Sequence, residues 1–160
     1  MRSMIALMTI TLALTTMSVR ESQALSAAAF ECQKAFAREG QTLNTAWHDG
    51  TADCLNRILG TGPTAGVQSS CASRYTAMET QRERSIVQLR SACSGVTDID
   101  ELGGPICDKA HIDGDNGAIF CILDDAQAHA RESILSQYHD PCETLGLVNM
   151  EAGFLADYCP

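Results

Sequence analysis

The sequence predicts an all-α fold, a disulfide-linked bundle of about five helices with one long acidic loop at residues 95–117. Apolar residues recur at the spacing of amphipathic helices through most of the chain, and the strict alternation typical of half-buried strands is nearly absent. Eight cysteines are never closer together than 14 positions, so we expect them to join separate helices. Short connections between the helical segments complete the pattern of a helix bundle.

The first two predicted helices lie before residue 60. Residues 26–47 form one helix, because Cys32, Phe36, Leu43 and Trp47 make an apolar stripe along it. The Asp-Gly-Thr sequence at residues 49–51 is expected to end this helix and to cap a shorter one at residues 52–59. Gly60 is the expected stop of that second helix, and residues 61–66 are loop by composition.

The third predicted helix is the clearest, at residues 67–94. Cys71 and Cys93 lie 22 residues apart on it, which is about 33 Å along a helix, so they cannot bond to each other. Each must therefore reach a different element. The residues that share the buried face of this helix are Cys71, Tyr75, Met78, Ile86, Leu89 and Cys93.

The loop at residues 95–117 interrupts the helical pattern. It holds five glycines, one proline and six acidic residues, and we expect Cys107 to anchor its middle. Long ordered loops are frequently functional, so this acidic loop is the predicted functional surface. The Asp-Gly-Asp-Asn-Gly sequence at residues 113–117 resembles the start of an EF-hand loop, but neither register puts glycine at the sixth position. A turn is the preferred interpretation, and a weak calcium site in the loop stays open.

Two further helices are predicted after the loop. One spans residues 118–139 with an apolar stripe, and the last begins at Asp140-Pro141. Asp140 is expected to cap it, with Glu143 completing a capping box. The expected buried residues of these two helices are Ile119, Leu123, Ala126, Ala130 and Ile134, followed by Leu145, Val148, Ala152, Leu155 and Cys159.

Two blocks of cysteines have similar spacing. Cys32, Cys54 and Cys71 are separated by 22 and 17 positions, and Cys121, Cys142 and Cys159 by 21 and 17. An aromatic-His-Asp triplet precedes the middle cysteine of each block, at residues 47–49 and 138–140. An internal duplication into two helical units is therefore one interpretation of the chain.

The N-terminal residues are typical of a secretory signal peptide. Arg2 precedes an uncharged apolar run at residues 4–17, which is too short for the about 20 residues of a membrane-spanning helix. Small residues at Ser22 and Ala24 favour cleavage after Ala24, and cleavage after Ala27 or Ala28 fits the same rule. We therefore expect a signal peptide at residues 1–24 and one helical, cysteine-rich domain at residues 25–160.

The eight cysteines are expected to form four disulfides, because an even number in an exported chain is typical of a disulfide framework. Zinc sites and redox Cys-x-x-Cys motifs need close cysteine pairs, which are missing. The sequence leaves all 105 pairings open. The cysteines are Cys32, Cys54, Cys71, Cys93, Cys107, Cys121, Cys142 and Cys159.

The chain is acidic, with a formal charge of −9. Removal of residues 1–24 takes away two arginines and one glutamate, which leaves −10. Such a surface repels the phosphates of nucleic acids and of anionic membranes, so nucleic acid is not an expected partner. No later segment is apolar enough to be a predicted membrane span.

The clearest catalytic motif is short. The sequence His139-Asp140-Pro141-Cys142 resembles the His-Asp-x-Cys part of secreted phospholipases A2. In that family the histidine activates water and the aspartate binds calcium, so the resemblance implies these roles for His139 and Asp140. The family's cysteine pair before the histidine is replaced here by Leu135 and Ser136. The helix junction explains the same residues through capping and the helix dipole.

These observations favour a secreted, extracellular protein without enzymatic activity that binds an extracellular partner. Toxin-like, effector-like, pheromone-like and matrix roles fit this description. The alternative is a carrier whose helices enclose a small apolar ligand, and a phospholipase-like hydrolase is the third hypothesis. We expect no catalytic residue, no cofactor and no metal site.

Overall fold

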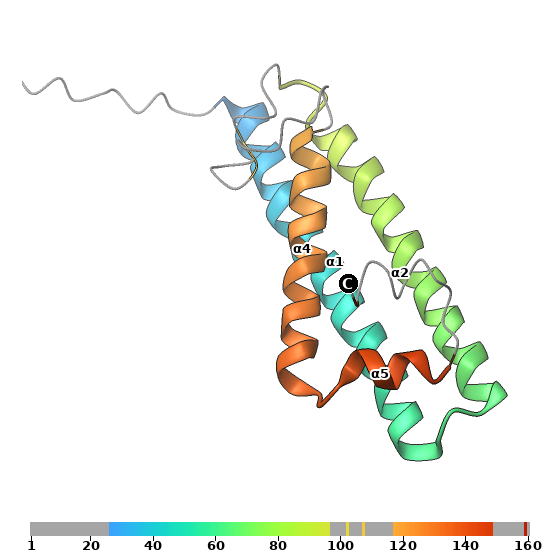
Figure 1. The fold of residues 1–160 in the computed structure, drawn as a ribbon. Helices are drawn as coiled ribbons and strands as arrows, with labels where there is room; N and C mark the ends of the chain where they lie inside the picture. Colours follow the sequence, from blue (N-terminus) through green and yellow to red (C-terminus); the bar gives the residue numbers. More distant parts are fainter. Residues whose placement is uncertain (1–25, 97–101, 103–106, 108–116, 149–158, 160) are drawn as a thin grey trace, which may run out of the picture.

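The computed structural model describes residues 26–96, 102, 107, 117–148 and 159. Within these residues the chain is helical and contains no strand. The four helices are α1 (Ala27–Thr61), α2 (Ala65–Ala92), α4 (Gly117–Gln137) and α5 (Pro141–Gly146), shown in Figure 1. The all-α prediction is confirmed, whereas the described part of the chain has four helices rather than about five.

The missing fifth helix is explained by α1, which runs without a break through residues 49–51. The prediction of separate helices at residues 26–47 and 52–59 is therefore wrong. Ser26 caps the start of α1, since its hydroxyl accepts a hydrogen bond from the Ala29 amide at 3.1 Å. The helix ends at Gly62 and not at Gly60, because Gly62 adopts a φ of 77° that favours glycine.

Gly50 stays inside α1 because α2 approaches closely there. A Cβ atom at this position would lie 2.6 Å from Sδ of Met78, which is a buried residue of α2. Glycine costs about 1 kcal/mol in a helix relative to alanine, yet here it lets two helices pack. The glycine therefore marks a helix contact, and tertiary packing overrides the local signal for a turn.

The other predicted helices agree better with the structure. The helix expected at residues 67–94 is α2, which Thr64 caps by accepting a hydrogen bond from the Val67 amide at 3.3 Å. The helix expected at residues 118–139 is α4. Pro141 opens α5 as predicted, but the side chain of Asp140 makes no capping hydrogen bond. The predicted capping box is therefore wrong, since Asp140 has a left-handed backbone that turns its carboxylate away from that role.

The central helix of the bundle is α1. It packs extensively on both α2 and α4, whereas α2 and α4 contact each other at few positions. In Figure 1, α2 diverges from α4 along its length, and α5 crosses near the far end of the pair. The core between α1, α2 and α4 includes Leu43, Leu55, Leu89, Ile119, Leu123 and Ile134, all fully buried.

Four disulfides join the eight cysteines. Two of them link α1 to α2, so Cys71 and Cys93 each reach the same neighbouring helix at different points along it. The third attaches the residues before α4 to that helix, and the fourth attaches α5 to the end of the chain. The pairs are Cys32–Cys93, Cys54–Cys71, Cys107–Cys121 and Cys142–Cys159.

Several predictions concern residues outside the described ones. The signal peptide at residues 1–24, most of the acidic loop at residues 95–117 and the last helix beyond Val148 belong to this group. The structure finds no helix long and apolar enough to cross a membrane among the residues it describes.

Candidate functional site

The motif that resembles phospholipases A2 lies at the junction between α4 and α5. The side chain of His139 is 98% exposed, and its Nε2 lies 3.0 Å from Oδ2 of the neighbouring Asp140. A catalytic histidine has to lie within reach of a bound substrate and is usually placed in a cleft. Here the imidazole of His139 and the carboxylate of Asp140 contact each other at the surface. This position favours the interpretation of the motif as part of a helix junction over its interpretation as a catalytic pair.

The described histidines do not converge on a common site. His48 in α1 approaches Gln137 in α4, with 3.3 Å between Nε2 and Oε1. His129 donates from Nδ1 to the backbone carbonyl of Asp125 at 2.8 Å, and this hydrogen bond raises the pKa of the exposed imidazole, with a further contribution from the Asp125 carboxylate. Within the described ranges, no three side chains of the His, Cys, Asp and Glu types lie together as a metal-binding group.

The sequence at residues 113–117, where a turn is preferred and a weak calcium site stays open, falls outside the described residues except for Gly117, which begins α4. The acidic loop as a functional surface therefore stays a prediction.

Among the described residues, two cavities lie between helices. The first has a volume of about 480 Å³ and lies between α2 and α4, over Trp47 of α1. We call it the α2–α4 cavity. Its remaining lining residues are Glu79 and Arg82 from α2 and Asp124, Gln127, Ala128 and Arg131 from α4.

Helical spacing brings the lining residues of this cavity together. On α4, Asp124, Gln127 and Arg131 follow one another at intervals of three and four residues, so they share one face of the helix. Glu79 and Arg82 share a face of α2 in the same way. Because α2 and α4 diverge, these two polar faces border an open space rather than a packed interface.

Arg82 bridges the two helices. Its Nη2 lies 2.6 Å from Oδ1 of Asp124, and its Nε donates to Oε1 of Gln127 at 3.1 Å. The guanidinium also lies 5.9 Å from the ring centroid of Phe120, within the range of a cation–π contact. Three contacts from one side chain that is 24% exposed fix the orientation of this arginine.

Arg131 lacks such partners. Its Nε is buried and has no hydrogen-bond partner, and among the described residues no carboxylate forms an ion pair with its guanidinium. A buried donor without an acceptor costs about 1–3 kcal/mol. The α2–α4 cavity therefore contains one arginine that is held by protein groups and one that is not.

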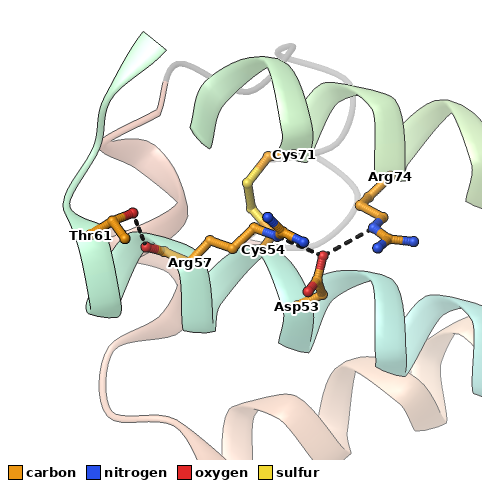
Figure 2. A network of polar contacts seen from close by, with 6 residues as sticks. All are labelled: Asp53, Cys54, Arg57, Thr61, Cys71 and Arg74. Atoms are coloured by element: carbon orange, nitrogen blue, oxygen red, sulfur yellow. Dashed lines mark hydrogen bonds and ion pairs between the residues drawn. A yellow bond between two sulfur atoms is a disulfide. The ribbon is translucent and has the colours of Figure 1, made fainter. Parts of the chain in front are cut away.

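The second cavity, of about 520 Å³, lies between α1 and α2 and is lined by Asp53 and Arg74 among others. Figure 2 shows Asp53 accepting hydrogen bonds from Arg57 of its own helix and from Arg74 of α2, at 2.9 and 3.0 Å. The hydrogen bond from Arg57 is the largest cause that lowers the pKa of Asp53, and the charge of Arg74 adds to it. This cluster lies beside the Cys54–Cys71 disulfide, and both guanidiniums share the one carboxylate of Asp53. We therefore assign it a structural role in joining α1 to α2.

The sequence did not identify the α2–α4 cavity. Charged residues on helices usually form solvated faces, and nothing in the sequence distinguishes the charged residues of this cavity from such faces. The available signal was the i, i+3, i+7 spacing of polar groups on α4 opposite a second polar face on α2, but periodicity alone does not tell which two faces border each other.

No family model matches the sequence, and neither the curated proteins nor the solved structures give a match.

Proposed function

We propose that this chain is an exported binding protein without enzymatic activity, which recognises a polar extracellular ligand or partner group through the α2–α4 cavity. The observation that carries the proposal is the cavity itself, with one arginine fixed by Asp124 and Gln127 and a second, Arg131, left without a partner. Pre-organised polar groups in a cavity of this kind are typical of ligand recognition.

The disulfide framework supports export and rigidity. Two disulfides hold α1 to α2, and a third holds α4 to Cys107. Disulfides persist in oxidising compartments, which agrees with the proposed signal peptide at residues 1–24. The first two disulfides hold α2, one wall of the cavity, on α1, which lowers the entropic cost of ordering that wall on binding.

A polar ligand is favoured over the apolar ligand of a carrier. Five of the seven residues that line the α2–α4 cavity are charged or carry an amide. The apolar side chains lie instead in a filled core, where Leu43, Leu55 and Ile119 are fully buried. An apolar ligand would leave the charged groups of the cavity desolvated and unpaired.

The proposal is tested by thermal shift with the disulfide-bonded mature chain, residues 25–160, against a library of polar metabolites and short peptides. A ligand that binds the folded state raises the melting temperature. The substitution Ala128→Trp fills the cavity without removing a polar contact, because Ala128 is an exposed lining residue. Ala72→Trp, at an exposed position of α2 that lines neither cavity described above, is the matched control.

We expect at least one polar compound to stabilise the wild type and Ala72→Trp but not Ala128→Trp. If every stabilising compound acts equally on both variants, or if none stabilises the wild type, the proposed role of the cavity is wrong. Saturable binding of the apolar dye N-phenyl-1-naphthylamine would instead support the carrier. Calcium-dependent phospholipid hydrolysis that is lost in His139→Ala would support the hydrolase.

A further inference from the structure

The ligand of the α2–α4 cavity can be narrowed from the charges that line it. Four charged side chains lie there, and Asp124 is already paired with Arg82. Arg131 carries a full positive charge, because a guanidinium stays protonated at any physiological pH. Its Nε is buried without an acceptor, and it has no ion-pair partner among the described residues. The unpaired group in the cavity is therefore a donor, and a ligand that pairs with it has to supply an acceptor.

We infer that the α2–α4 cavity binds a small monocarboxylate whose carboxyl group pairs with the guanidinium of Arg131. This inference rests on the proposed binding role of the same cavity and adds the chemical class of the ligand. A carboxylate supplies two oxygens in the plane of the guanidinium, and such pairs are among the strong hydrogen bonds in proteins. Arg82 is less suited to this task, since its charge is already paired with Asp124 and its Nε donates to Gln127.

The charge of the cavity favours a monoanion over phosphate. The two arginines are balanced by Glu79 and Asp124, so the lining groups have a formal charge of zero. The mature chain around them carries a formal charge of −10, as counted above from the whole-chain value of −9. A dianion would meet more repulsion from the carboxylates of Glu79 and Asp124 than a monoanion would, because the repulsion grows with the charge of the ligand.

The volume of the cavity and its uncharged lining residues limit the size and the chemistry of the rest of the ligand. A volume of about 480 Å³ lies within the range of sites for small molecules. Trp47 and Ala128 supply the apolar part of the lining. The body of the ligand is therefore a small ring or a short aliphatic chain that contacts these two residues while its carboxyl group faces Arg131.

The experiment is an NMR titration of the disulfide-bonded mature chain labelled with ¹⁵N-arginine. Benzoate is the probe, and benzamide is its uncharged counterpart of nearly equal shape. We expect benzoate to shift the Nε–H signal of Arg131 in a saturable way and benzamide to leave it unchanged. The substitution Arg131→Gln should weaken benzoate binding at least about tenfold, as expected for the loss of a charge-assisted hydrogen bond.

The control variant is Arg84→Gln. It removes the same charge from α2 but lines the cavity between α1 and α2 and not the α2–α4 cavity. We expect it to bind benzoate with unchanged affinity. Equal weakening by both variants would overturn the inference, because it would show attraction by overall charge. Equal binding of benzoate and benzamide, or no saturable shift up to 10 mM, where about 10 mM corresponds to only about 3 kcal/mol of binding free energy, would overturn it as well.

A peptide C-terminus carries the same carboxyl group, so N-acetyl-Gly-Gly and its C-terminal amide form a second pair of probes. Tighter binding of the peptide acid than of benzoate identifies a chain terminus as the source of the carboxylate, and the reverse identifies a free acid. If no acid binds, but an uncharged compound stabilises the wild type and not Ala128→Trp, the proposed ligand class is wrong and the proposed function stands. Failure of every compound in that screen contradicts the proposed function itself.

Discussion

The triplets at residues 47–49 and 138–140 share the order aromatic, histidine, aspartate but adopt different structures. The first lies inside α1, where Trp47 is 1% exposed and the helix continues through Gly50. The second follows Gln137, the last residue of α4, and its Asp140 has a φ of 50° before Pro141 begins α5. The difference lies in the residue that follows. Proline disfavours a helical conformation in the residue before it, whereas glycine permits the helix and the close approach of Met78.

The two triplets also lie near each other in the fold. His48 approaches Gln137, and the hydroxyl of Tyr138 donates to Oδ1 of Asn56 at 3.2 Å. The break between α4 and α5, which the second triplet forms, therefore occurs where this part of the chain contacts the continuous helix α1. The three-residue pattern therefore does not determine the local structure. The packing partner and the residue that follows the pattern determine it. Four substitution experiments test this comparison, beginning with the largest expected effect.

The aromatic residues are predicted to differ most. Trp47 is buried and packs edge-to-face against Tyr75, with 6.3 Å between ring centroids. Trp47→Ala should lower the free energy of unfolding by about 3–5 kcal/mol, since it leaves a large cavity. Tyr138→Ala should lower it by about 1 kcal/mol, because the side chain is only partly buried. Urea denaturation with intact disulfides measures both changes in the free energy of unfolding. Equal changes for the two variants would contradict the difference in burial.

The glycines of α1 give the second comparison. Gly50→Ala forces Met78 to move, so we expect a loss of about 1–2 kcal/mol despite the better helix propensity of alanine. Gly60→Ala meets no atom within 4 Å and should gain about 0.5 kcal/mol. In a Met78→Ala background the clash is removed, and Gly50→Ala should then become stabilising. A loss of unchanged size in that background would show that the contact with Met78 is not the cause.

The aspartates are predicted to respond to glycine with opposite signs. Asp140→Gly relieves a left-handed residue and should raise the free energy of unfolding by about 0.5 kcal/mol after the entropic cost of glycine. Asp49→Gly places a second glycine beside Gly50 in the middle of α1 and should lower it by about 0.5 kcal/mol. Chemical denaturation of the two variants side by side checks the signs, and the same sign for both would contradict the two backbone assignments.

The smallest effect concerns Asp53, which contacts Arg74 because α1 continues past Gly50. Its pKa is lowered in the folded state, so its ion pairs stabilise the fold above the ordinary pKa of 3.8, and this contribution is lost as the pH falls through the lower folded pKa. Asp53→Asn should cost at most about 0.5 kcal/mol at pH 7, since the group is partly exposed to solvent. The difference from the wild type should disappear at about pH 2, and a difference that grows on acidification would contradict the ion pairs.

Much of the fold follows from the sequence. The apolar stripes of α2 and α4 predict both helices to within two residues of their observed ends, because each stripe is long and free of internal glycine or proline. The inference that Cys71 and Cys93 do not bond to each other is also confirmed, since it depends only on the length of a helix, although both of them pair with cysteines of the same helix, α1.

The failures have different causes. The predicted cap at Asp140 fails locally, because Asp140 adopts a left-handed backbone before Pro141. Gly50 was interpreted from local rules for turns, whereas its close approach to Met78, far away in the sequence, is what it serves. The α2–α4 cavity was missed for the same reason. Arg82 and Arg131 line one cavity only because α2 and α4 diverge. The angle between two helices cannot be predicted from a local sequence pattern.

The central claim, an exported helical scaffold fixed by four specific disulfides, is tested most directly by mass mapping of the secreted chain without reduction. Trypsin alone leaves Cys93 with Cys107 in one peptide and Cys142 with Cys159 in another, so a second protease that cuts at acidic residues is required. The account predicts an N-terminus at Leu25 and cross-linked peptides for Cys32–Cys93, Cys54–Cys71, Cys107–Cys121 and Cys142–Cys159 alone. Free thiols, other pairings or a retained N-terminal segment would contradict it.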